Sequence, residues 1–141
     1  MLLTAENSHC EERQKIIVSR DRGTSREHRA YNREQKYCVR HYKLDGELVK
    51  QQKCCDFLLI NDTCRRAYFI ELKGGNVDEA IPQLEKATRI CRPELEGYEY
   101  YYRIVQSKAR THDLKKLSFR KFKDKCGSRL RYQTERMEED L

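Results

Sequence analysis

The chain has 141 residues, a length typical of one domain and sufficient to bury a hydrophobic core without disulfide support. Charged and hydrophobic residues each make up 38% of it, and the formal net charge of +7 favours a soluble protein that binds phosphate polymers or anionic surfaces. No apolar run approaches the roughly 20 residues of a membrane-spanning helix, so no membrane span is expected.

The seven cysteines do not have the arrangement of a disulfide framework. Their number is odd, and the polar residues that follow positions 1–3 do not form a secretory signal, so a reducing, cytoplasmic location is expected. Structural zinc is the alternative, although no two cysteines have the short spacing of a zinc knuckle. Adjacent Cys54 and Cys55 would point to opposite faces of a strand.

Segment 1–36 has the weakest secondary-structure signal in the chain. Ser8 and Glu11 have the spacing of a capping box at the start of a short helix, whereas the β-branched run at 16–18 favours a strand. The polar stretch 20–33 is expected to be a loop or a loosely held helix.

A clear strand signal begins at residue 37. Segments 37–43 and 48–53 flank Asp45-Gly46, a pair suited to the positive φ angles of a tight hairpin turn. A second hairpin follows, with strands at 55–60 and 67–72 and a polar turn at 61–66. With 48–60 taken as one long strand, the pattern predicts three consecutive antiparallel strands.

A helix is predicted after Gly74-Gly75, with Asn76 or Asp78 as its cap. Its apolar face recurs at helical spacing and consists of Val77, Ala80, Ile81, Leu84, Thr88 and Cys91.

The remaining elements are a strand at 100–105, a strongly basic helix at 114–126 that stops at Gly127, and a last strand at 130–134. The order of three strands, helix, strand, helix and strand predicts an α/β fold. In it, a mixed sheet is flanked by helices, and residues 1–141 form one domain with an acidic tail at 135–141.

Two ionisable residues share one face at the end of the apolar third strand, because Glu71 and Lys73 are two positions apart. If the second hairpin turns between Thr63 and Cys64, Asp56 lies directly opposite Glu71, with Cβ atoms about 4.5–5.5 Å apart. Two carboxylates that close repel each other unless a cation lies between them. Mg²⁺ or Mn²⁺ suits such a pair, and the carbonyl of Leu72 is close enough to help.

Lys73 completes this arrangement. Its ammonium group can hold a water molecule or a phosphate oxygen beside the metal, and the metal lowers the pKa of a bound water. The three side chains therefore have the chemistry needed for phosphodiester hydrolysis. The alternatives are that both carboxylates are solvent-facing strand residues, and that Lys73 protects a sheet edge.

The pattern resembles the PD-(D/E)XK superfamily, which includes restriction endonucleases, and the resemblance covers roughly 37–108. It implies a restriction-endonuclease-like core, metal ligation by Asp56 and Glu71, and Lys73 as the catalytic lysine. Gln83 resembles the glutamine that several branches carry on the following helix.

Two departures from the family pattern concern the residues around this motif. Cys55 stands where the namesake proline is expected. Many members also have an upstream acidic residue, for which Glu12, Glu27 and Glu34 are candidates.

Segment 103–131 holds eleven Lys or Arg residues against Asp113 and Asp124, which predicts a surface that contacts a phosphate backbone. The residues proposed for these contacts are Lys115, Lys116, Arg120, Lys121 and Lys123. A solvated helix face is the alternative. Tyr98 and the tyrosines at 100–102 are expected to pack in the core and at the sheet edge rather than to stack on nucleic-acid bases.

Together these features predict a Mg²⁺-dependent nuclease that acts on DNA in preference to RNA. A catalytically idle module that binds nucleic acid or protein, such as an inhibitor, is the second hypothesis. Sequence specificity would need loops, a homodimer or a protein partner, because the chain has no room for a separate recognition domain.

Overall fold

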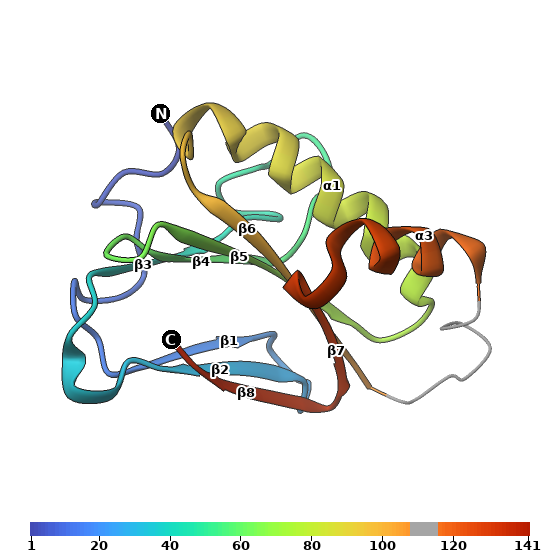
Figure 1. Ribbon diagram of the computed structural model, residues 1–141, viewed down its shortest axis with the longest axis horizontal. Coiled ribbons are helices and arrows are strands. Elements are labelled where there is room, and N and C mark those ends of the chain that lie inside the picture. The colour runs from blue at the N-terminus through green and yellow to red at the C-terminus, as the bar shows by residue number, and fades with distance from the viewer. Residues whose placement is uncertain (108–115) are drawn as a thin grey trace.

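The computed structural model describes residues 1–107 and 116–141, which form a mixed α/β fold of three layers (Figure 1). A five-stranded sheet occupies the middle layer, helices cover one of its faces, and a three-stranded sheet covers the other. The predicted α/β class is confirmed. Helices were expected to flank the sheet; in the described residues they lie on one face only. None of the described helices is long and apolar enough to cross a membrane.

The main sheet has the strand order β3-β4-β5-β6-β7. Its strands are β3 (Val39–Lys43), β4 (Phe57–Asn61), β5 (Arg66–Lys73), β6 (Glu99–Gln106) and β7 (Leu130–Thr134). The pairs β3–β4 and β4–β5 are antiparallel, as predicted, whereas β5, β6 and β7 run parallel to one another. Parallel neighbours require crossover connections, which contain α1 (Ala80–Cys91) and α3 (Leu117–Cys126).

The start of α1 follows the predicted signals. The Asn76 side chain accepts a hydrogen bond from the Asp78 backbone N–H and so caps a 3₁₀ turn that leads into the helix. Pro82 lies in the first turn of α1, where its missing N–H costs no hydrogen bond. The 3₁₀ turns of the described chain are η1 (Arg33–Gln35), η2 (Val77–Glu79), η3 (Arg92–Glu94) and η4 (Gly127–Arg129).

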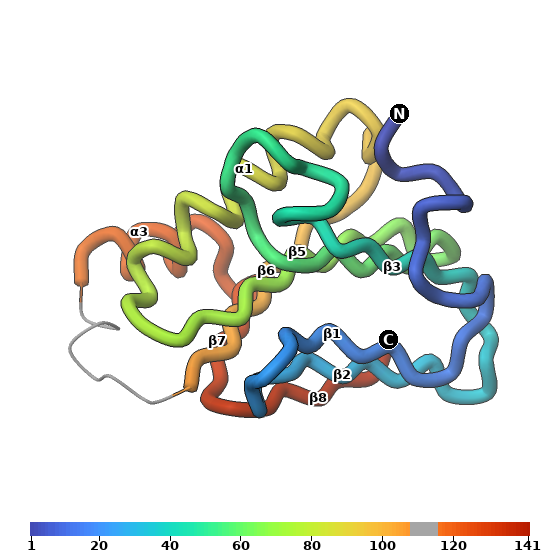
Figure 2. The backbone as a smooth tube through the Cα atoms, turned by 180° about the vertical axis from the view of Figure 1, so that it is seen from behind, coloured from blue at the N-terminus to red at the C-terminus, as the bar shows by residue number. Residues whose placement is uncertain are grey.

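The small sheet brings the first two strands of the chain beside its last strand (Figure 2). It has the order β1-β2-β8, with β1 (Ile16–Arg20) antiparallel to β2 (Glu27–Tyr31) and β2 parallel to β8 (Arg136–Asp140). The β-branched run therefore forms a strand, and residues around Ser8 form turns rather than a helix. The acidic tail 135–141 supplies β8.

The expectation of a loop or helix at 20–33 was wrong, because β2 lies there. Its sequence is polar, but His28 and Ala30 are fully buried against the main sheet. Ion pairs such as Arg29 Nε–Glu27 Oε2 at 2.9 Å satisfy the charges. A strand that buries paired polar groups lacks the alternation of apolar and polar residues from which strands are recognised.

The predicted strand at 48–53 was also wrong. Residues 44–56 form a folded loop in which the N–H of Leu44 donates to the carbonyl of Asp56 at 2.8 Å. Gly46 has a φ of +80°, so it does supply a turn, but the turn lies inside this loop. Val49 and Cys54 are buried on the helix side of the main sheet, and this burial holds the loop down.

Strand β4 is buried on both faces and separates two cores. Leu58 and Ile60 face the helices, whereas Phe57 and Leu59 face the small sheet. This double burial explains why the segment is apolar without alternation.

A buried ion cluster around Glu139 links the two sheets. The Glu139 carboxylate on β8 accepts hydrogen bonds from Arg103 Nε on β6 at 2.7 Å and from His28 Nε2 on β2 at 2.6 Å. Its side chain is 8% exposed. Burial by itself would raise the pKa of Glu139, but the hydrogen bonds from His28 and Arg103 outweigh it and lower the pKa to about 2.

We predict that Glu139→Gln lowers the free energy of unfolding at pH 7 by about 3 kcal/mol, because Arg103 loses its buried counter-ion. The carboxylate stabilises the fold fully above the ordinary glutamate pKa of 4.5, and this stabilisation is lost as the pH falls toward about 2. Urea unfolding of wild type and variant over this pH range measures the difference.

Glu138→Gln is the matched control, because Glu138 lies next to Glu139 on β8 but is 47% exposed. We expect a much smaller loss for this variant. Equal losses for the two variants would contradict a special role for Glu139.

Candidate active site

The predicted register between β4 and β5 is confirmed, because Phe57 pairs with Ile70 and Leu58 with Phe69. Asp56 immediately precedes β4, so it lies across from Glu71. Its N–H donates to Glu71 Oε1 at 3.1 Å, and its own Oδ2 accepts from the N–H of Leu72 at 2.9 Å. The hairpin therefore holds both carboxyl groups together by hydrogen bonds to backbone amides.

Glu71 is 4% exposed, although it is a charged residue type. Burial raises its pKa most, and the charge of Asp56 and a hydrogen bond with the Asp56 side chain raise it further, to about 10. Lys73 lowers it only in part. The two carboxyl groups therefore hold a proton at neutral pH, at a position where a cation could replace it.

Lys73 lies on the same face of β5 as Glu71, but its ammonium group pairs with Glu79 at 2.9 Å. The Lys73 side chain is 16% exposed and that of Glu79 is 65% exposed. Lys43 Nζ lies 3.5 Å from Asp56 Oδ1. Two lysines therefore flank the carboxylate pair.

Gln83 lies in the first half of α1, and its Oε1 is buried without a hydrogen-bond partner in the described chain. It lines a surface hollow of about 500 Å³ together with Lys53, Glu79 and Lys86. Because Glu79 is also the partner of Lys73, the structure brings Gln83 to the same end of the main sheet as the carboxylate pair.

Sequence reasoning missed Asp21 and Arg26, which come from the connection between β1 and β2. Burial raises the pKa of Asp21, and the charge of Asp56 raises it further, so the two carboxylates lie near each other. Arg26 Nη1 donates to Ser107 Oγ at 2.5 Å. The same nitrogen would lie 3.2 Å from a Cβ at Gly74. The guanidinium can therefore pack against the backbone at Gly74 because this residue has no side chain.

In the described residues, none of the three upstream acidic candidates contacts Asp56 or Glu71. Glu27 pairs with Arg29, and Glu12 accepts a hydrogen bond from the Cys38 thiol. Glu34 lies in η1, at the far end of β2. Asp21 lies near Asp56 instead, because the small sheet folds its β1–β2 connection toward the end of β5, an arrangement with no local sequence signal.

A divalent cation fits the donor set only in part. Asp56 and Glu71 supply two carboxylates, the number that Mg²⁺ commonly takes from a protein. The Leu72 N–H points to Asp56, and the carbonyl of the same residue lies on the same edge of the strand. In residues 1–107 and 116–141, no three His, Cys, Asp or Glu side chains are grouped so that they could hold a metal.

The predicted basic surface is present in part. Arg120, Lys121 and Lys123 are exposed on α3, whereas Lys116 Nζ pairs with Asp78 Oδ2 at 3.2 Å. Lys115 lies outside the described residues.

The tyrosines of β6 and the turn before it pack as expected. Tyr98 donates to Asp62 at 2.5 Å, and the ring of Tyr101 stacks on Tyr68 with centroids 5.1 Å apart. Tyr102 is buried.

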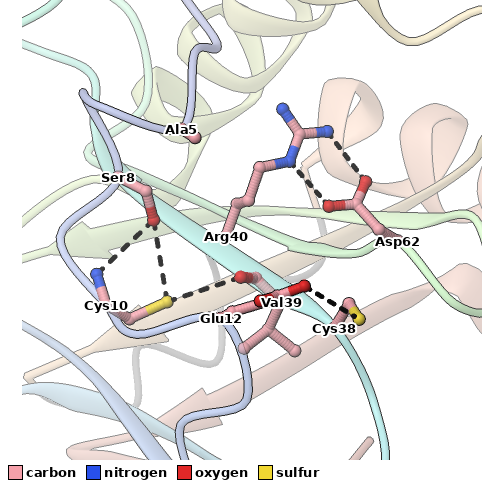
Figure 3. A pocket seen from close by; sticks show the side chains of 8 residues that line it. All are labelled: Ala5, Ser8, Cys10, Glu12, Cys38, Val39, Arg40 and Asp62. Carbon is pink, nitrogen blue, oxygen red and sulfur yellow. Dashed lines mark hydrogen bonds and ion pairs between the residues drawn. The ribbon is translucent and has the colours of Figure 1, made fainter.

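A second pocket contains two of the seven cysteines, all of which are free (Figure 3). Cys10 Sγ donates to the carbonyl of Val39, and Cys38 Sγ donates to Glu12. Burial raises the pKa of the Cys10 thiol, so this thiol is a poor nucleophile. The zinc alternative gains no support from it, because in the described residues no three His, Cys, Asp or Glu side chains are grouped so that they could hold a metal.

Comparisons of the chain with protein-family models, with curated proteins and with solved structures return no significant match. The functional interpretation therefore rests on the motif and on the geometry of Asp56, Glu71 and Lys73.

We predict that Glu71→Gln removes a pH-dependent destabilisation of the metal-free protein. A carboxyl group with a pKa near 10 in the fold, against an ordinary 4.5, costs stability increasingly as the pH rises between these values. The variant should exceed wild type by up to about 3 kcal/mol at pH 7 and match it near pH 4. Urea unfolding in EDTA across this range tests the prediction. Curves that differ by a constant offset would contradict it.

Proposed function

We propose that this protein is a nuclease of the PD-(D/E)XK type that hydrolyses phosphodiester bonds with Mg²⁺ or Mn²⁺, acting on DNA in preference to RNA. The observation that carries the proposal is the pairing of Asp56 and Glu71 across one hairpin, with Lys73 next on the same face. A purely structural strand end has no need to hold two carboxyl groups together in a buried position. The antiparallel β3–β5, followed by α1 and the parallel β6, supports the restriction-endonuclease-like core that the resemblance implies.

Asp56, Glu71 and the Leu72 carbonyl are the groups that would hold the ion. The bound ion supplies a water of lowered pKa and neutralises charge on the phosphate. The Leu72 N–H orients Asp56 through its 2.9 Å hydrogen bond, and the buried site keeps both carboxylates fixed. Glu71 would have to release its proton to hold the ion, because a carboxyl group binds a metal in its deprotonated form.

Lys73 acts on the substrate rather than on the ion. An incoming phosphate competes with Glu79 for its ammonium group, and Glu79 is exposed enough to turn into solvent. Lys43 and Arg26 add positive charge near Asp56 and Gly74. These cations offset the repulsion that two carboxylates exert on a phosphodiester.

A second candidate function is a binding module without catalysis, with nucleic acid or protein as its partner. The Lys73–Glu79 and Lys43–Asp56 pairs favour it, because they neutralise the site internally without a metal. The two candidates differ in whether binding is followed by cleavage, so a metal-dependence assay on labelled DNA and RNA duplexes, junctions and single strands separates them.

We predict that Asp56→Asn and Glu71→Gln each abolish Mg²⁺-supported cleavage, because each removes a charged ligand. Lys73→Ala should lower kcat by about 10²- to 10³-fold with little change in metal affinity. Gel assays of cleavage and calorimetric titration with Mg²⁺ measure these effects.

The matched controls are Asp140→Asn and Glu138→Gln, which make the same chemical changes on exposed residues of β8. Both should cleave at the wild-type rate. Full activity of Asp56→Asn, Glu71→Gln or Lys73→Ala would rule out the proposed site.

We also predict that the exposed cations of α3 contact a phosphate backbone. Reversal of Arg120, Lys121 and Lys123 to Glu should reduce the log–log salt slope of duplex binding by about two to three units, near 0.9 per lost contact. Fluorescence anisotropy with Ca²⁺ in place of Mg²⁺ measures the slope without cleavage. Lys15→Glu with Lys36→Glu is the control, because both lysines are exposed near the small sheet. Identical slopes for wild type and the α3 variant would show that this helix face is only solvated.

A further inference from the structure

A second cationic hollow lies between the C-terminal halves of α1 and α3 and the start of β6. Its volume is about 330 Å³, at the lower end of the range for small-molecule sites. Arg89 and Arg92 line it from α1 and the turn that follows, and Lys125 and Arg129 line it from the corresponding part of α3. Glu85 is its one acidic lining residue within the described chain.

These four cations form no ion pairs in the part of the chain that the structure describes, in contrast to Arg40, which pairs with Asp62. The hollow therefore combines four positive charges with one negative charge in a concave surface. Such a surface attracts an anion.

Stabilisation of the helix dipoles accounts for only part of this arrangement. Arg89 and Lys125 lie in the last turns of α1 and α3, where a positive charge is favourable in any helix. Arg92 and Arg129 follow the two helices, yet they line the same hollow. Favourable interaction with the helix dipoles does not explain why side chains from two helices line the same hollow.

Arg129 is held in place by contacts of its own. Its Nη1 donates to the carbonyl of Tyr100 at 3.3 Å, and its carbonyl accepts from Arg103 Nη1 at 2.8 Å. The buried ring of Tyr102 closes the hollow from the sheet side. At least one guanidinium is thus ordered before any ligand arrives, which lowers the entropy cost of binding.

We propose that this hollow is a binding site for a phosphate group. Guanidinium groups match phosphate oxygens in planar, bidentate geometry, and a lysine adds a mobile point charge. The volume of about 330 Å³ accommodates a phosphate or a pyrophosphate.

The hollow is separate from the carboxylate pair and does not depend on its chemistry. Tyr100 and Tyr102 pair with Ala67 and Phe69 in the first half of β5, whereas Glu71 and Lys73 lie at the end of that strand. The six residue-to-residue steps from Ala67 to Lys73 span about 20 Å. If the phosphate belongs to a nucleic acid, this site contacts the backbone away from the point of cleavage.

The test is calorimetric titration of the full-length protein with inorganic pyrophosphate and with inorganic phosphate, in EDTA at low salt. Arg89→Ala combined with Lys125→Ala should weaken pyrophosphate binding at least about tenfold, the value of one lost charge-assisted contact. The control, Lys15→Ala with Lys36→Ala, removes the same charge on the far side of the main sheet and should stay within about twofold of wild type.

All substituted residues are exposed, so thermal melting should show both double variants folded. Absence of pyrophosphate binding to wild type, or equal weakening in both variants, would overturn the proposal. Displacement of bound pyrophosphate by a short DNA duplex supports a nucleic acid as the source of the phosphate, and its retention supports a small phosphorylated compound. Glu71→Gln should bind pyrophosphate like wild type, so the result stands whether or not the protein cleaves DNA.

Discussion

The pairing of β4 with β5 is the constraint on which the rest of the structure depends. Both strands are buried along almost their whole length, and each contributes side chains to two different cores. A slip of one residue would exchange Leu58 and Leu59 between the helix side and the small-sheet side, so burial specifies the register strongly. The same register places Asp56 across from Glu71, and thus the hydrophobic pattern determines the position of the polar pair.

Polar contacts determine how the small sheet lies on the main sheet. Apolar packing between the sheets is non-directional, whereas Glu139 bonds to Arg103 on the main sheet with fixed geometry. Ser19 Oγ on β1 lies 2.8 Å from His41 Nε2 on β3, and burial lowers the pKa of His41 to about 3. Burial of these polar groups costs desolvation energy. Because their contacts align the two sheets, Asp21 and Arg26 lie at the end of β5.

The net positive charge is distributed unequally over the surface, because cations on the small sheet are paired with carboxylates and many cations on the described part of the helix layer are not. On the small sheet, Arg29, Arg136 and the nearby Arg33 pair with carboxylates. On the helix layer, cations of α3 and of the hollow it forms with α1 have no such partner within the described chain. The excess charge is thereby concentrated on the helix layer, which also borders Lys73 and Gln83 and which the proposed nucleic-acid substrate would contact.

The sequence by itself determined the β4–β5 register, α1, β6, β7 and the basic character of α3, because each follows from a local apolar period or turn signal. It also predicted that Asp56 lies opposite Glu71 with Lys73 on the same face, since one hairpin places them together. Only the tertiary structure decided the strand at 27–31, the loop at 44–56 and the proximity of Asp21 and Arg26 to the site. In these segments the partners are distant in the chain. A polar residue in these segments can be buried only where a distant residue supplies an opposite charge or a hydrogen bond, and no local sequence pattern predicts that partner.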